Sequence, residues 1–222
     1  LPLGEVPECE RREHAETWLM GAPGSMTVIT SLMREHYGDI DERPREPRDP
    51  YRTLIGCVLS HRTRDANSSR ATRNLFAEIE GPLDLLAMNQ DTLKTLIRCS
   101  GFYNQKARSI IAISRVLVDD FSGIVPEDRA TLMGLPGVGP KTADIVLSYA
   151  FGKPAIAVDV HVSRVARRLG LAPVDAGPEP VKETLESLVP QDSYRFVDNA
   201  FVRHGKEFCR NTKPRCTGCF LS

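Results

Sequence analysis

The most informative stretch is a glycine-rich turn, Leu135-Pro136-Gly137-Val138-Gly139-Pro140-Lys141-Thr142. Gly137 and Gly139 permit positive φ and a close approach to the backbone. Pro140 suits the first turn of a helix, where a missing N–H group costs nothing. A short helix is predicted before the turn, at 129–133, and a largely buried one after it. This helix–turn–helix unit would offer the N–H groups at the start of its second helix to a phosphate.

Several kinds of site contain such a turn. A nucleotide P-loop requires Gly-x4-Gly-Lys-Ser/Thr after a strand; Gly134 and Gly139 have this spacing, but Pro140 separates Gly139 from Lys141. A dinucleotide-binding fingerprint would need a third glycine at the position of Thr142, again after a strand. A hairpin that binds a nucleic-acid backbone phosphate needs no strand. A plain turn between two helices, without a ligand, is the remaining alternative.

The rest of the sequence favours helices. Apolar residues recur at i, i+1, i+4 and i+5 in the segments 28–33 and 54–59, which is helical periodicity. The best candidate for a strand is Ala155-Ile156-Ala157-Val158, which is short and follows Pro154. Glycines and prolines divide the chain into roughly ten helices joined by short loops. The sequence therefore predicts an all-α fold, with residues 1–25 as an extension of uncertain origin.

Composition and charge limit the function. The 222 residues are 41% hydrophobic and 26% charged, and 29 basic residues balance 29 acidic ones, which excludes a histone-like polycation. The basic residues are nevertheless concentrated: 61–73 holds four arginines and one aspartate, and 203–222 holds five basic residues and one acidic. These segments could attract a polyanion if the fold placed them on one face. No apolar run approaches the ~20 residues of a membrane span, and no signal peptide is visible, so we expect a cytoplasmic protein.

Lys141 and Asp159 are the candidates for chemistry. Asp159 follows the apolar run that ends at Val158 and lies 18 residues after Lys141. A buried neutral amine is a nucleophile for imine formation, and a nearby carboxylate can assist proton transfer and stabilise positive charge on a sugar. Alternatively, Asp159 caps the following helix and Lys141 is a solvated surface residue.

These motifs resemble those of the helix-hairpin-helix DNA glycosylases, and most closely those of endonuclease III. The resemblance covers about residues 26–222 and rests on Leu135–Ala143, Ala157–His161, Gly101–Ala107, Val125–Arg129 and the C-terminal cysteines. It implies a six-helix domain over 43–153 and a second domain formed by 26–42 with 154–222. Double-stranded DNA would lie in the groove between them, and the protein would act as a monomer.

The resemblance also implies a reaction. Lys141 matches the nucleophile that expels the damaged base and forms a Schiff base with the opened sugar, before β-elimination cuts the strand 3′ to the lesion. Asp159 matches the essential aspartate. Oxidised pyrimidines or abasic sites in duplex DNA are the expected substrates; mismatched thymine or uracil, 8-oxoguanine, or a non-catalytic DNA-binding module are the alternatives. DNA contacts are expected at His61, Arg62, Phe102, Gly137, Val138, Gly139, Thr142, His161, Lys213 and Arg215.

Two of these residues would fill the gap that a displaced nucleotide leaves. Phe102 lies where the family places an apolar wedge; a core phenylalanine after a helix end is the alternative. Arg62 stands where glutamine is usual in the family, and a cation there could bond the edge of the orphaned base or a phosphate.

The C-terminal cysteines are expected to bind a metal. Cys209, Cys216 and Cys219 are spaced C-x6-C-x2-C. The family pattern adds a fourth cysteine, and the four cysteines together bind a [4Fe–4S] cluster. That position would be residue 225, beyond Ser222. A zinc site that uses His204 with the three cysteines is the alternative, and free thiols are another. A metal would fold a basic loop against phosphates. The scattered Cys9, Cys57 and Cys99 are expected to be inert packing residues.

Overall fold

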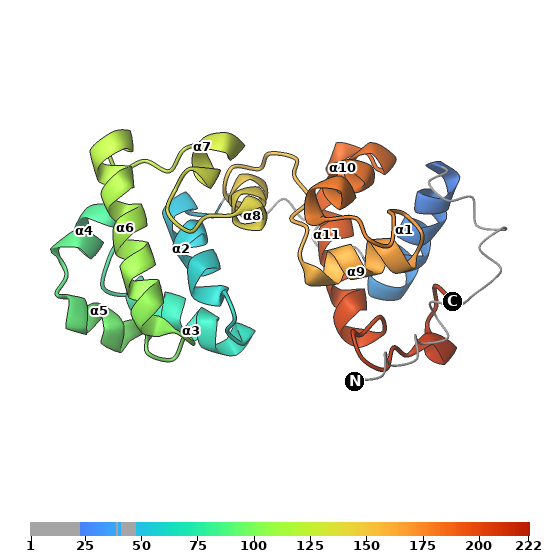
Figure 1. Ribbon diagram of the computed structural model, residues 1–222, viewed down its shortest axis with the longest axis horizontal. Coiled ribbons are helices and arrows are strands. Elements are labelled where there is room, and N and C mark those ends of the chain that lie inside the picture. Colours follow the sequence, from blue (N-terminus) through green and yellow to red (C-terminus); the bar gives the residue numbers. More distant parts are fainter. Residues whose placement is uncertain (1–22, 39, 41–47) are drawn as a thin grey trace. The chain divides into compact units, whose positions relative to one another are not determined.

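The structure is a computed structural model and describes residues 23–38, 40 and 48–222. Throughout this part of the chain the regular elements are helices and none is a strand (Figure 1), which confirms the all-α prediction. The described residues divide into two compact units: those within Glu46–Lys153 form one, and those within Pro154–Ser222 form the other together with residues 23–38 and 40. None of the helices that the structure describes has the length and apolar character of a membrane span.

The unit of Glu46–Lys153 is built around two long buried helices. Its elements are α2 (Pro50–Ser60), α3 (Asp65–Leu75), α4 (Pro82–Ala87), α5 (Gln90–Ile97), α6 (Tyr103–Phe121), α7 (Arg129–Met133) and α8 (Pro140–Ala150). Helix α2 contacts α3, α6 and α8, and its Leu54, Ile55 and Leu59 are fully buried. Ile110 and Ile113 of α6 are also fully buried. The start of α8 is thereby held against α2.

Local sequence signals explain where these helices begin. The side chains of Asp49, Asn89 and Asp128 accept hydrogen bonds from backbone N–H groups in the first turns of α2, α5 and α7. Such a cap stabilises a helix by about 1 kcal/mol. Pro140 is the first residue of α8, as its ring geometry and missing N–H group predict.

The second unit has a helical core that includes the N-terminal helix. Its elements are α1 (Pro23–Tyr37), α9 (Val160–Arg168), α10 (Pro178–Leu188), the 3₁₀ turn η2 (Gln191–Ser193), α11 (Tyr194–Glu207) and the 3₁₀ turn η3 (Cys216–Gly218). Helix α11 contacts α9 and α1, and Phe196 and Phe201 on α11 are buried in the core with Met26 and Met33 of α1. Helix α1 starts at Pro23, inside the stretch expected to be an extension; residues 1–22 lie outside the described part of the chain.

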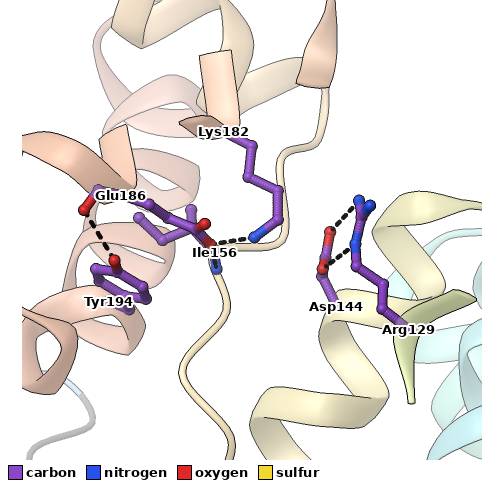
Figure 2. Close-up of polar contacts among 6 residues, drawn as sticks. All are labelled: Arg129, Asp144, Ile156, Lys182, Glu186 and Tyr194. Carbon is purple, nitrogen blue, oxygen red and sulfur yellow. Dashed lines mark hydrogen bonds and ion pairs between the residues drawn. The ribbon is translucent and has the colours of Figure 1, made fainter. Parts of the chain in front are cut away.

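The candidate strand Ala155–Val158 is not a strand. Its four residues are buried but have no strand partner among the described residues, because alternation alone does not provide a neighbouring edge. A carboxylate holds the segment instead: Glu186 of α10 accepts hydrogen bonds from the backbone N–H of Ile156 (2.9 Å) and from the ammonium of Lys182 (Figure 2). The hydroxyl of Tyr194 donates to the backbone carbonyl of Glu186 over 2.8 Å. The residues that lead to Asp159 are thereby fixed to α10.

Candidate functional site

The predicted hairpin is formed by α7, a tight turn and α8. Gly137 has φ 75° and Val138, which follows it, is buried, so the turn folds over its own side chain. Gly139 caps α8 with φ −100°, and only Gly137 therefore needs the left-handed conformation. No atom lies within 4 Å of a Cβ built on either glycine. The outer face of the turn is thus open to the approach of a ligand backbone.

An ion pair that the sequence analysis missed joins the two hairpin helices. The guanidinium of Arg129 on α7 donates to both carboxylate oxygens of Asp144 on α8, over 2.8 and 3.1 Å (Figure 2). Asp144 is 1% exposed. A two-point contact of this kind fixes orientation as well as distance. It determines how the first turn of α8 is presented.

Lys141 lies in the first turn of α8 and is exposed. The amine is therefore not buried in the protein alone, and the alternative of a solvated surface lysine describes its position. Its charge nevertheless acts on α2: it lowers the pKa of His61, which partial burial and the charge of Lys106 also lower. The His61 ring lies beside Thr142, with Nε2 3.3 Å from Oγ1. Thr142, a predicted DNA contact, is itself 3% exposed.

Cys57 of α2, four residues before His61, is half-buried. Burial raises the pKa of its thiol to about 11, against the opposing charges of Lys141 and Arg48. A thiol in that state is a poor nucleophile, as expected for a packing residue. Cys99 is also half-buried, and its thiol lies 3.5 Å from the carbonyl oxygen of Asn67. Cys9 lies outside the described residues.

Asp159 is half-buried at the start of α9. Its Oδ1 accepts hydrogen bonds from the backbone N–H groups of His161 (2.7 Å) and Val162 (2.9 Å). The capping interpretation is therefore confirmed. A capping carboxylate is held in one orientation, which suits a group that must face a substrate. Asp159 and Lys141 belong to different units of the chain.

The residues expected to fill the DNA gap have strained backbones. In the described part of the chain, positive φ angles at residues other than glycine occur at Arg62 (50°), Phe102 (59°), Ser122 (54°) and Lys213 (54°). Ser122 caps the end of α6, and the other three are predicted DNA contacts. Phe102 is 61% exposed, so the alternative of a core phenylalanine is wrong. Strain that the fold maintains at exposed positions is typical of functional loops.

His161 lies in the contact between α9 and α11. Its Nδ1 is 3.0 Å from the guanidinium of Arg164, which also donates to the carbonyls of Gly205 (2.9 Å) and Cys209 (2.7 Å). A Cβ on Gly205 would lie 2.9 Å from that of His161, so glycine is required for this contact. His161 is half-buried, whereas the other predicted contacts of this unit, Lys213 and Arg215, are exposed.

The three C-terminal cysteines are half-buried but not gathered. Cys219 Sγ lies 3.6 Å from His204 Nε2, and the guanidinium of Arg168 is 3.7 Å from Cys209 Sγ. Burial lowers the pKa of His204 to about 4, so its ring is neutral, the form in which an imidazole binds a metal. Thiolates and imidazole suit zinc or iron. Among the described residues, however, no three histidine, cysteine or acidic side chains are close enough to hold a metal ion, so this arrangement does not fit a closed metal site.

Aromatic rings hold the C-terminal loop instead. The rings of His36 and Phe220 stack with centroids 4.1 Å apart, and those of His204 and Phe208 stack at 5.5 Å. The hydroxyl of Tyr37 lies 3.4 Å from Nδ1 of His204. The sequence analysis missed this cluster, because its members come from α1, α11 and the last residues of the chain.

Comparisons with known proteins identify the family of the chain. The family model of HhH-GPD superfamily base excision DNA repair proteins matches residues 55–191. The chain belongs to this superfamily. Endonuclease III of Thermotoga maritima is 43% identical over 194 residues, which cover 87% of this chain and 90% of that protein. Endonuclease III of Escherichia coli (strain K12) is 40% identical over 172 residues, 78% of this chain and 81% of that protein. The endonuclease III family is therefore the family of this chain.

Solved structures give the same result. A trapped covalent intermediate of endonuclease III with DNA has a TM-score of 0.81 and 36% identity, and covers 90% of this chain and 93% of that one. A thermostable thymine-DNA glycosylase has a TM-score of 0.77 and 27% identity, over 89% and 94% of the two chains. The resemblance stated from the sequence motifs is thus confirmed.

Proposed function

We propose that Lys141 and Asp159 carry the reaction of a base-excision repair DNA glycosylase and abasic-site lyase that removes oxidised pyrimidines from duplex DNA. The supporting observation is the position of Lys141. It lies one residue inside α8, directly after the open glycine turn, in a chain of the endonuclease III family. An amine at this place can reach a sugar whose phosphate is bound by the same turn.

The hairpin supplies the phosphate contact. The first N–H groups of a helix have no carbonyl partner within it, and the helix dipole adds positive potential there. The open space beyond Gly137 and Gly139 lets a phosphate approach these groups closely. The Arg129–Asp144 pair, whose carboxylate is buried, keeps α7 and α8 at a fixed angle during binding. The grip is independent of DNA sequence, as a repair enzyme requires.

Lys141 would act as the nucleophile in its neutral form. Its amine attacks the anomeric carbon of the extruded nucleotide as the C–N bond to the base breaks. The base leaves with the bonding electron pair and takes up a proton, and the amine, now bonded to the sugar, loses one. Because Lys141 is exposed, bound DNA must itself exclude water from the amine. The lowered pKa of His61 keeps that ring neutral at pH 7, so it adds no second positive charge beside the amine.

Asp159 would stabilise positive charge on the sugar and move the protons that imine formation requires. The cap bonds from His161 and Val162 fix its carboxylate. Asp159→Asn tests this role sharply, because an amide oxygen can accept the same cap bonds. We expect that variant to fold normally and to lose base excision. Normal excision by it would remove Asp159 from the chemistry.

Borohydride trapping tests the nucleophile. Wild-type protein should become covalently joined to lesion-containing duplex DNA, and Lys141→Ala should not. Lys153→Ala is the matched control, because Lys153 is another exposed lysine of the same unit and its ammonium contacts Glu127. Equal trapping by wild type and Lys141→Ala would refute the role of Lys141. A panel of duplexes with oxidised pyrimidines, mismatched thymine or uracil, and 8-oxoguanine identifies the preferred base.

A [4Fe–4S] cluster on Cys209, Cys216 and Cys219 is a further proposal, supported by the family and by the cysteine spacing. Zinc, with His204 as an added ligand, is the competing proposal. The cysteines must move together for either metal to bind, and the metal would have a structural role. Visible charge-transfer absorption and iron analysis would support the cluster; a colourless protein that contains zinc would support the alternative.

A further inference from the structure

The two loops that carry Arg62 and Phe102 are in direct contact. One follows α2 and the other precedes α6. The N–H of Gly101 donates to Thr63 Oγ1 over 3.0 Å. A Cβ on Gly101 would lie 3.2 Å from the carbonyl oxygen of Arg62 and 3.3 Å from Thr63 Oγ1. The two loops therefore pack closely at Gly101, where a side chain would crowd the neighbouring loop.

A single buried ammonium group, that of Lys106, forms hydrogen bonds to both loops. Lys106, in the first turn of α6, is 5% exposed. Its Nζ donates to the carbonyl of Leu59 (2.7 Å), to Thr63 Oγ1 (2.7 Å) and to Ser100 Oγ (2.8 Å). The three protons of the ammonium thus have three acceptors, one at the end of α2 and one in each loop.

The environment of Lys106 is unusual for a buried cation. Its acceptors are a carbonyl and two hydroxyls rather than a carboxylate, so the charge is not used in an ion pair with them. Burial lowers the pKa of Lys106 to about 8. The carbonyl of Leu59 lies at the negative end of α2, where a cation is favoured. An apolar side chain would fill this space without desolvating a charge, but it would leave the acceptors of both loops unpaired.

The two residues held in this way are the strained ones. Arg62 and Phe102 both have left-handed backbones, and each lies within one residue of an acceptor or donor of this network. A strained conformation persists only where surrounding contacts over-determine it. The contacts around Thr63 and Ser100 are the ones that do so here.

We propose that Lys106 is a positioning residue that holds the Arg62 and Phe102 loops as one unit, so that both side chains enter the duplex together when a nucleotide is displaced. This inference rests on the proposed function, because it assigns the two side chains to the gap in the DNA. Thr63 is the link between the ammonium and both loops. It offers a milder perturbation than removing the buried lysine.

The test uses Thr63→Val, which keeps the shape and removes the hydroxyl, and Thr63→Ser, which keeps the hydroxyl. Single-turnover excision from a lesion-containing duplex is measured for each. We expect Thr63→Val to be slower by about tenfold or more, because it loses the hydrogen bonds from the Lys106 ammonium and from the Gly101 N–H. Thr63→Ser should retain the wild-type rate. Lys106→Met should be slower still, and the Thr63 variants carry the test if Lys106→Met fails to fold.

A double-mutant comparison separates positioning from general destabilisation. In an Arg62→Ala/Phe102→Ala background, Thr63→Val should have no further effect, because the side chains that it positions are gone. The same loss in both backgrounds, or no loss in the wild-type background, would overturn the proposal. Failure of the wild-type protein to process any lesion would instead refute the proposed function.

Discussion

Replacing Phe102 by alanine and by glycine separates the two consequences of this residue, one for the DNA and one for the fold. Its ring is 61% exposed and its backbone is left-handed, with φ 59°. Both substitutions remove the ring. We therefore expect both to slow excision from duplex DNA to the same extent, because neither variant can fill the gap left by the displaced nucleotide.

The stabilities of the two variants should differ. A left-handed conformation costs a residue with a side chain about 1–2 kcal/mol, and glycine avoids this cost. The greater flexibility of glycine in the unfolded chain offsets about 0.5–1 kcal/mol of that gain. The glycine variant should therefore be more stable than the alanine variant by about 0.5–1 kcal/mol, or by about 1–4 °C in melting temperature for a chain of this size.

Thermal unfolding and single-turnover kinetics on the same preparations test both expectations. Equal melting temperatures of the alanine and glycine variants would show that the backbone at residue 102 is not strained. Excision at the wild-type rate by both variants would show that the ring does not fill the gap. Severe unfolding of both variants would instead support the alternative that Phe102 is a core residue, which its exposure in the structure contradicts.

Three further outcomes are expected. Gly137→Ala should destabilise the protein by about 1 kcal/mol or more, because φ 75° disfavours a side chain even in open space, whereas Gly139→Ala should fold normally and weaken DNA binding; equal unfolding midpoints in denaturant would contradict this. Asp144→Asn should lower the free energy of unfolding by about 1–3 kcal/mol, since it removes the carboxylate charge that faces the Arg129 guanidinium; an unchanged midpoint would show that the pair is dispensable. Burial lowers the pKa of His204 from 6.5 in the unfolded chain to about 4 in the folded protein. Its contribution to stability is therefore full above pH 6.5 and is lost as the pH falls towards 4. His204→Asn should make the free energy of unfolding depend less on pH between 6.5 and 4, and an unchanged dependence would refute this expectation.

The parts of the site that are local in sequence could be predicted. Pro140 and Asp159 are helix-start residues whose roles follow from one or two neighbours, and both stand where they were expected. The hairpin has the same character, because its glycines and prolines are consecutive. Its resemblance to a known family then gave the reaction.

Features that depend on distant partners could not be predicted. Lys106 is bonded to a carbonyl 47 residues away, and no pattern within α6 marks it as buried. Asp144 reads as an ordinary polar residue in α8 until Arg129 is found 15 residues earlier in the chain. The exposure of Lys141 could not be decided from the sequence for a related reason: the burial of a side chain in the first turn of a helix depends on segments that are distant in the chain.

The anchoring of Ile156 by Glu186 connects the proposed role of Asp159 to helix α10. Helix α10 contributes no side chain to the predicted DNA contacts, yet its Glu186 fixes the segment that leads to Asp159. A screen that scores repair rather than stability should therefore find sensitive positions along α10, because loosening this segment would shift the Asp159 carboxylate without altering a predicted DNA contact.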